Sequence, residues 1–456
     1  MNQNQHKRSA FSGKIGFVLS AAGASVGLGN IWRFPYLAAK YGGGIFLLIY
    51  IILAFTFGYT MIVAETALGR MTRKSPVGAF AAVRKGGRSF GGWINAIIPI
   101  LIVPYYSVIG GWVIRYLADY VSGHGSELAT DGYFSAFISS GASAEICFVI
   151  FTIFTLAIIF AGVRNGVERV SKVMMPILVV LSVIIAGYSV TRPGALEGVK
   201  YFLVPNLSNF SWMTVVTAMG QMFYSLSIAM GILVTFGSYM KKDVSIEEST
   251  EHVEIFDTLI AVMAGLMIIP AVFSFSGGDP DTLQAGPALM FITIPKVFES
   301  MGLGTVVGIL FFTLVLFAAV TSSIALTESA VSTFEDELGW NRKQATVLIG
   351  IIMLVLGSLS ALGYGPLARF TVFGMQFLDF FDFLTNSVMM PIAAITTCLL
   401  VSRVIGVEKI EEEVTLEGKP FRRKRIFNFM IKYLCPIFAA IILISSVANA
   451  LGVISM

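Results

Sequence analysis

The sequence predicts an all-α membrane protein that crosses the bilayer many times. Only 13% of its 456 residues are charged and 56% are hydrophobic, whereas an ordinary soluble domain carries about 25% charge. The mean hydropathy of +0.82 means that polar side chains are too few to cover the apolar ones. Because apolar stretches recur along the whole chain, we expect one membrane domain, residues 1–456.

About eleven stretches approach the roughly 20 apolar residues that a membrane-spanning helix needs. The predicted spans are 15–38, 43–68, 92–120, 145–162, 168–190, 213–238, 257–277, 303–331, 345–362, 376–401 and 428–452.

Basic residues are concentrated in alternate connections, as the positive-inside rule requires. Lys7, Arg8 and Lys14 flank the first span and "RRKR", 422–425, precedes the last, while connection 121–142 has no Lys or Arg. We therefore expect a multi-pass protein of the cell membrane with a cytoplasmic amino terminus and an extracellular carboxyl terminus. No cleavable signal peptide is expected. We interpret "RRKR" as a topology signal, with an anionic-lipid site as the alternative.

The first predicted span contains an unusual stretch, "AAGASVGLGNIWRFP", residues 21–35. Inside a bilayer every backbone polar group must be paired within the protein, so a helix can break only where it is buried or lines a cavity. The glycines at 23, 27 and 29 permit non-helical backbone and close approach of a ligand. Close helix packing through small residues is the alternative. Asn30 and Arg33, which follow within a turn, favour a break at a binding site.

The sixth predicted span is interrupted in a comparable way by "GQMFYSLSIAMG", 220–231, with polar Gln221, Ser225 and Ser227. Two inverted repeats of five helices would put the first and sixth spans in matching positions, which is the usual sequence pointer to a transporter's substrate site. The expected repeats are 15–190 and 213–401, followed by an additional eleventh helix at 428–452. Broken half-helices offer N–H groups to an anion and carbonyls to a cation.

Oxygen-bearing side chains accompany these breaks. Asp257 lies in "EIFDTLIAVMAG", and Thr321 and Ser322 lie in "FAAVTSSIALTESA". Together with Asn30 and freed carbonyls they form a hard-oxygen set, which suits Na⁺ rather than a transition metal. The sequence has no nucleotide-binding loop or histidine cluster, so we expect no enzyme activity, and the net charge of +4 requires no nucleic-acid partner. No pattern indicates an oligomeric state.

Several motifs resemble the neurotransmitter:sodium symporter family, and its bacterial LeuT-like branch in particular. "GLGNIWRFPY", "YGGG" at 41–44, "GQMFYSLS", "VTSSIA" and "FEDELGWNRKQA" occur in the family's order over nearly the whole chain. The resemblance implies a LeuT-like fold with a 5+5 inverted repeat and discontinuous helices 1 and 6. It also implies secondary active, Na⁺-coupled symport of an amino acid by alternating access.

The resemblance further implies two sodium ions. The first site would use the Ser25 carbonyl, the Asn30 side chain, Ser225 and Asp257. The second would use the carbonyls of Gly23, Val26 and Ala318 and the hydroxyls of Thr321 and Ser322.

The family's substrate site would lie between spans 1, 3, 6 and 8. Tyr106, in "PYYSVIGG", matches the tyrosine whose hydroxyl binds the substrate carboxylate. The other expected pocket residues are Ser25, Gly27, Leu28, Gly29, Ile102, Tyr224, Ser225, Ser227, Met230, Ser322, Ser323 and Leu326. Met230 can repack around bulky side chains and, with Tyr224, favours a hydrophobic or aromatic amino acid.

Two positions depart from related carriers. Gly27 stands where the monoamine carriers have an aspartate, so the substrate is expected to bring its own carboxylate. Tyr50, Gln221 and Ser225 match the family's chloride pocket, but Asp257 stands where an asparagine is usual. Because a fixed carboxylate beside Na⁺ would make the anion redundant, we expect chloride-independent transport.

The resemblance also implies gates on both sides of the site. Arg33 and Asp382 would form the external pair, and Arg8 and Asp336 the internal pair. The alternative for Arg33 is that its side chain extends to water.

In the fifth span, Gly166 and Pro176 match a family segment that unwinds to admit water to the second sodium site, with Glu168 as a participant. Proline removes one helical hydrogen bond and glycine eases unwinding. A simple proline kink is the alternative.

Two other functions remain as alternatives. A membrane sensor or scaffold would bind the ligand without moving it, but the short connections leave no room for a large receptor domain. A proton-coupled carrier of related fold is the second. The hydroxyl pair Thr321 and Ser322 favours Na⁺ over a proton.

Overall fold

The computed structural model describes residues 9–83, 89–277 and 286–453. Within these ranges the regular structure is helical, apart from one isolated bridge between Val372 and Met375, so the predicted all-α class is confirmed. In chain order the helices are α1 Lys14–Ser25, α2 Phe34–Lys40, α3 Gly44–Leu53, α4 Tyr59–Thr72, α5 Pro76–Val83, α6 Phe90–Val121, α7 Tyr133–Ser139, α8 Ala142–Phe160, α9 Arg169–Val190, α10 Ala195–Leu203, α11 Trp212–Ser225, α12 Ile232–Tyr239, α13 Ile246–Ser276, α14 Ile294–Glu299, α15 Gly304–Leu338, α16 Arg342–Leu362, α17 Phe377–Asp382, α18 Met390–Leu399, α19 Val407–Val414, α20 Lys424–Phe429 and α21 Cys435–Ala450.

Some membrane spans consist of two consecutive helices joined by a wider π-helical turn. For example, α3 and α4 together form the span Gly44–Thr72. In the described part of the chain, nine helices are long and apolar enough to cross a membrane, and a tenth is the first span if its bent pair counts as one. That pair, Lys14–Ser25 and Gly29–Lys40, is bent by 54°. The predicted sixth span is divided into α11 and α12, each too short to cross alone, by residues 226–231. Both predicted interruptions are therefore present.

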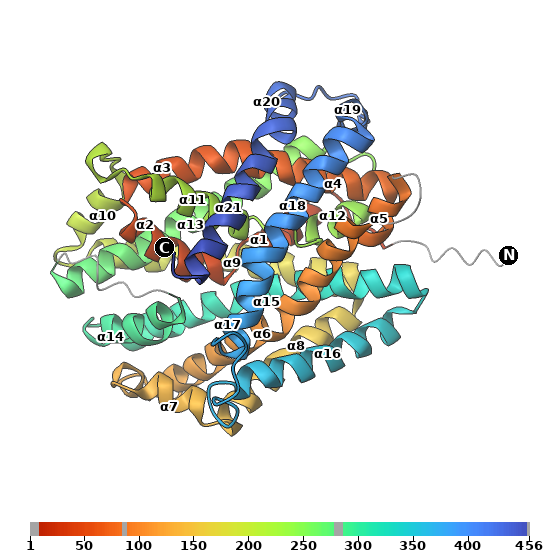
Figure 1. Ribbon diagram of the computed structural model, residues 1–456. Helices are drawn as coiled ribbons and strands as arrows, with labels where there is room; N and C mark the ends of the chain where they lie inside the picture. Colours follow the sequence, from red (N-terminus) through yellow and green to blue (C-terminus); the bar gives the residue numbers. More distant parts are fainter. Residues whose placement is uncertain (1–8, 84–88, 278–285, 454–456) are drawn as a thin grey trace.

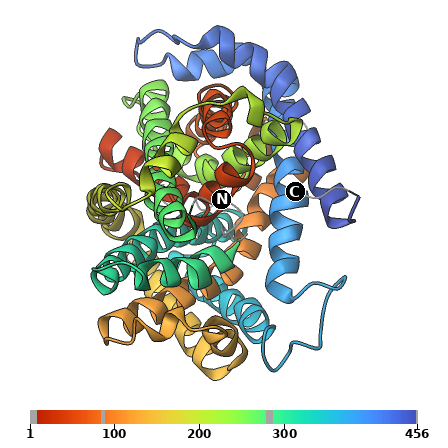
Figure 2. The ribbon, with the colours of Figure 1, turned by 90° about the vertical axis from the view of Figure 1, so that its left-hand side faces the viewer.

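The spans form a bundle in which most helices run side by side (Figure 1). α6 packs against α15, α8 and α16, and α1 packs against α13, α15 and α9. The last two spans, drawn in blue, lie at the edge of the bundle (Figure 2). The broken first span is thus enclosed by helices from both halves of the sequence.

Local sequence sets the ends of the helices around the broken spans. The Ser245 side chain accepts a hydrogen bond from the Glu248 amide at the start of α13, and Gly277 ends the helix with a left-handed φ of 69°. A serine cap satisfies a free N–H of the first turn, and glycine adopts a positive φ without steric penalty.

Two glycines fix α12 against α4. A Cβ on Gly69 would lie 1.9 Å from the Val234 carbonyl oxygen, and a Cβ on Gly237 would lie 2.4 Å from the Thr66 carbonyl oxygen. Since both obstacles are backbone atoms, no side-chain rotation relieves them. α12 and α4 therefore pack backbone to backbone at these two glycines.

We expect Gly69→Ala to separate these two helices and to lower the stability of the protein by about 1–3 kcal/mol, as overpacking of a buried contact does. The measurement is the midpoint of thermal unfolding in detergent. Gly187→Ala is the matched control, because a Cβ there meets nothing within 4 Å. Equal midpoints for the two variants would contradict the close packing.

Candidate functional site

The break in the first span exposes backbone carbonyls beside α15. The Ser322 hydroxyl lies within hydrogen-bond distance of three carbonyl oxygens, those of Gly23, Ala24 and Val26, at 3.3, 3.1 and 3.4 Å. Thr321 approaches the same turn, and its hydroxyl lies 3.1 Å from the Ala318 carbonyl oxygen. The carbonyls and hydroxyls predicted for the second sodium site thus come together, and the donor set is entirely oxygen, as Na⁺ requires.

Asp257 is the centre of a second buried group. Its Oδ1 accepts hydrogen bonds from Asn30 Nδ2 at 2.8 Å and from the Ser225 hydroxyl at 2.9 Å. Its Oδ2 accepts from the Tyr50 hydroxyl at 2.8 Å. Asn30 Oδ1 in turn accepts from the Gly27 amide at 3.1 Å, which ties this group to the break. The side chains predicted for the first sodium site therefore contact one another, and all are buried.

The two hydroxyls predicted to match a chloride pocket, those of Tyr50 and Ser225, donate hydrogen bonds to the Asp257 carboxylate. Tyr50 donates to Asp257 directly, and its hydroxyl also lies 3.2 Å from that of Ser225. Gln221 donates through Nε2 to the Gly29 carbonyl at 3.1 Å. The Asp257 carboxyl group therefore lies among the side chains that were predicted to match a chloride pocket.

A small cavity of about 30 Å³ lies between these two groups. Its lining residues are Ala24, Ser25, Gly27, Leu28, Gly29, Asn30, Ile102, Tyr106, Tyr224, Ser225, Ser227, Met230, Ser322 and Leu326. Tyr106 accepts a hydrogen bond from the Leu28 amide at 3.3 Å, so its hydroxyl and a freed N–H face the same space. A Cβ on Gly27 would lie 2.7 Å from Ser322 Oγ and 3.1 Å from the Tyr106 hydroxyl. The absence of a side chain at position 27 therefore keeps this cavity open.

One predicted pocket residue lies away from this cavity in the structure. Ser323 does not line the cavity; its hydroxyl lies 3.2 Å from that of Thr155 on α8. Successive residues of an α-helix are about 100° apart, and in this structure Ser322 faces the cavity while Ser323 faces α8. Ala24, which the sequence motifs did not single out, lines the cavity instead, and its carbonyl accepts from the Ser227 hydroxyl at 3.0 Å.

A larger cavity of about 370 Å³ lies on one side of the small one, and Tyr224 lines both. Arg33 and Asp382 also line it, but within the described ranges they form no ion pair with each other. The Arg33 guanidinium lies 5.3 Å from the centre of the Tyr224 ring, and Asp382 accepts from Asn386 Nδ2 at 2.6 Å. The predicted external pair is therefore apart in this structure.

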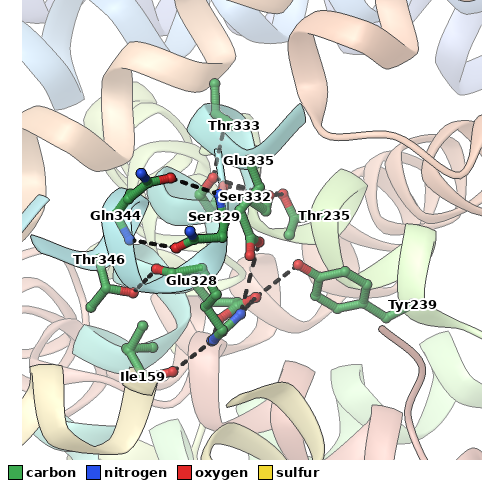
Figure 3. A network of polar contacts seen from close by, with 12 residues as sticks. Ile159, Thr235, Tyr239, Glu328, Ser329, Ser332, Thr333, Glu335, Gln344 and Thr346 are labelled. Carbon is green, nitrogen blue, oxygen red and sulfur yellow. Dashed lines mark hydrogen bonds and ion pairs between the residues drawn. The ribbon is translucent and has the colours of Figure 1, made fainter. Parts of the chain in front are cut away.

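The contacts around the predicted internal pair were predicted only in part. Arg8 lies outside the described residues, and Asp336 accepts from the Ser75 amide at 2.6 Å. Deeper in α15, the fully buried Glu328 accepts from the Tyr239 hydroxyl at 2.7 Å and forms an ion pair with Arg342 (Figure 3). Arg342 also donates to the Ile159 carbonyl at 2.8 Å. The network joins α12, α15 and α16 to the end of α8.

A buried acidic residue inside an apolar span is a functional candidate by default, so "ALTESA" in the eighth span held the signal for Glu328. Its partner was not predictable, because Arg342 lies at the first residue of the next helix and resembles a topology signal.

The fifth span is helical where unwinding was predicted. A π-helical turn, Val163–Glu168, leads directly into α9, which continues through Pro176. A Cβ on Gly166 would lie 2.0 Å from the Ile158 carbonyl oxygen, so glycine is needed here for close packing. Glu168 accepts from the Ser12 amide at 2.9 Å and from Lys172 Nζ at 2.5 Å. In this state Glu168 holds the amino-terminal segment against the wound helix.

Comparisons with known proteins agree with this geometry. The model of the sodium:neurotransmitter symporter family matches residues 8–128 and 135–453. The sodium-dependent transporter YhdH of Bacillus subtilis is 33% identical over 99% of this chain and 100% of its own length. The human sodium- and chloride-dependent GABA transporter 2 is 26% identical over 90% of this chain and 75% of its own length.

Among solved structures, the crystal structure of MhsT in complex with L-phenylalanine superposes with a TM-score of 0.86. It is 33% identical and covers 96% of this chain and 100% of MhsT. The predicted LeuT-like fold class is therefore confirmed.

Proposed function

The chain belongs to the sodium:neurotransmitter symporter family and is therefore a sodium-dependent membrane transporter rather than an enzyme, and we propose that it carries an amino acid by symport with Na⁺. The observation that carries this proposal is the buried cluster of Asp257, Asn30 and Ser225 beside a cavity lined by Tyr106 and the broken first span. Alternating access would open that cavity to one side of the membrane at a time.

The substrate would be a hydrophobic or aromatic amino acid. Because position 27 is a glycine, the broken first span provides no carboxylate to the cavity at this position. The Tyr106 hydroxyl and the Leu28 amide line the cavity and would bind the carboxylate of the substrate. The apolar end of the cavity is lined by Ile102, Met230 and Leu326. MhsT, with its bound L-phenylalanine, supports an aromatic substrate.

Two Na⁺ ions would bind in this arrangement. One would lie at Ser25, Asn30, Ser225 and Asp257, completed by the substrate carboxylate, and the other at Gly23, Val26, Ala318, Thr321 and Ser322. The shared ligand would make substrate and Na⁺ raise each other's affinity, as linkage requires. Transport would be independent of chloride, because Asp257 already engages Tyr50 and Ser225.

The remaining residues would control access. Arg33 and Asp382 would close the larger cavity by pairing, and Arg8 and Asp336 would close the other side. Unwinding between Gly166 and Pro176 would free Glu168 and open the release path.

The topology follows from the basic residues of the sequence. We propose a cytoplasmic amino terminus, an extracellular carboxyl terminus, and inverted repeats at 15–190 and 213–401, with 428–452 as the additional helix.

Equilibrium binding of radiolabelled L-phenylalanine to the purified protein tests the proposed substrate class. We expect binding in NaCl and in sodium gluconate but not in choline chloride. Phenethylamine, which lacks the carboxylate, should compete about 10- to 100-fold less well than phenylalanine, because a hydrogen bond to a charged group contributes about 1.5–3 kcal/mol. Binding that ignores Na⁺, or equal competition by phenethylamine, would contradict the proposal.

A further inference from the structure

The last span carries two cations on a face that points to lipid. Arg425 and Lys432 are spaced by close to two helical turns, so they lie on one stripe of the helix. Both are exposed, as are the apolar side chains beside them: Ile426, Phe429 and Tyr433 are 41%, 56% and 57% exposed. Figure 2 shows this span at the edge of the bundle. A stripe of exposed isoleucine and aromatic residues on a membrane span faces acyl chains.

Three of the acidic residues at this end of the molecule, Glu251, Glu254 and Glu411, pair with other cations. Arg423 pairs with Glu251 at 3.4 Å and Glu254 at 3.2 Å, and Lys424 pairs with Glu411 at 2.5 Å. The side chains of Arg425 and Lys432 form neither an ion pair nor a hydrogen bond with any residue in 9–83, 89–277 or 286–453. Their charge is uncompensated by the described part of the protein.

Lys432 lies well inside the last span. Lys432 lies eight residues beyond the start of α20 at Lys424, or about 12 Å along the axis at about 1.5 Å per residue. The headgroup layer of one leaflet is about 5–8 Å thick, so Arg425 and Lys432 are farther apart along the axis than one headgroup layer unless the lysine side chain extends toward Arg425. A lysine whose backbone lies below that layer extends its amine back to the surface. Because helical side chains lean toward the helix N-terminus, Lys432 extends toward the level of Arg425.

We propose that Arg425 and Lys432 bind the phosphate of an anionic phospholipid in the leaflet where α20 begins. Two cations on one stripe would hold the headgroup phosphate, and Phe429 and Tyr433 between and beside them would contact the acyl chains. Lys432 lies within a π-helical turn, Met430–Leu434, a distortion that is frequent at functional sites. A soluble anion is the less suitable ligand, because the side chains exposed beside both cations are apolar. This site is separate from the substrate cavity, and the proposal does not depend on transport.

Native mass spectrometry of the detergent-purified full chain tests the proposal, with dioleoylphosphatidylglycerol and dioleoylphosphatidylcholine as probes. We expect the wild type to bind the phosphatidylglycerol more tightly. A double variant with Arg425→Gln and Lys432→Gln should bind it at least fivefold less tightly, with phosphatidylcholine binding unchanged. Arg425→Lys with Lys432→Arg keeps both charges and should keep the affinity.

The control variant combines Lys343→Gln with Lys409→Gln, which removes the same charge from exposed positions off the stripe. It should bind the phosphatidylglycerol like the wild type. An equal loss in this control would mean diffuse attraction and would overturn the site. Wild-type affinity in the Arg425 and Lys432 double variant would overturn it too, as would displacement of the lipid by an equal concentration of inorganic phosphate.

Discussion

An Asp257→Asn variant is expected to bind Na⁺ and substrate about 10- to 100-fold less tightly in chloride-free medium. The substitution removes the fixed negative charge that Asn30, Ser225 and Tyr50 surround. A hydrogen bond or contact to a charged group contributes about 1.5–3 kcal/mol, and about 1.4 kcal/mol is a factor of ten. The measurement is Na⁺-dependent uptake of radiolabelled substrate in gluconate.

Chloride should restore part of the uptake of this variant, because the hydroxyls of Tyr50 and Ser225 would then face an open anion position. The wild type should work equally well in chloride and in gluconate. Asp243→Asn is the control, since it removes one carboxylate from an exposed connection. Collapse of wild-type uptake in gluconate would contradict the role of Asp257 as the compensating charge.

Glu328→Gln is expected to destabilise the protein by about 3–5 kcal/mol, because removing one partner of a buried ion pair leaves the other charge uncompensated. Glu328 is fully buried and binds both Arg342 and Tyr239, so the variant should also loosen the contact between α12, α15 and α16. The measurement is the free energy of unfolding in detergent.

Glu335→Gln is the matched control for Glu328→Gln. Glu335 lies 3.9 Å from Arg342, and its side chain is 25% exposed, so its loss should cost no more than about 1 kcal/mol. Equal destabilisation by the two substitutions would contradict the claim that the buried ion pair of Glu328 with Arg342 stabilises the protein more than the partly exposed contact of Glu335 does.

Hydropathy located the spans but not their polar ends. The eighth span was predicted at 303–331 and α15 extends from Gly304 to Leu338; the seventh was predicted from residue 257 and α13 begins at Ile246. In both cases the additional turns carry glutamates, and a count of apolar residues does not register helical turns that contain charged side chains. The broken first and sixth spans were predictable because glycines and polar residues together inside an apolar run weaken a membrane helix at that point.

The candidate site was predictable to the extent that its residues lie in family motifs. Asn30, Ser225 and Asp257 come from three distant segments and meet as the resemblance implied. The motif "VTSSIA" predicted both Ser322 and Ser323 for the pocket, and only the rotation of α15 shows that Ser322 lines the cavity while Ser323 contacts Thr155. The pairing of Glu328 with Arg342 depends on how two helices pack, which no local pattern records.

Uptake of radiolabelled L-phenylalanine into proteoliposomes tests Na⁺-coupled amino-acid symport most directly. An inward Na⁺ gradient should drive accumulation above the external concentration, and dissipation of the gradient with a sodium ionophore should release the accumulated substrate. An equal proton gradient without Na⁺ should drive none. Binding of the amino acid without Na⁺-driven accumulation would contradict symport and would favour a sensor, and accumulation driven by protons alone would contradict the coupling ion.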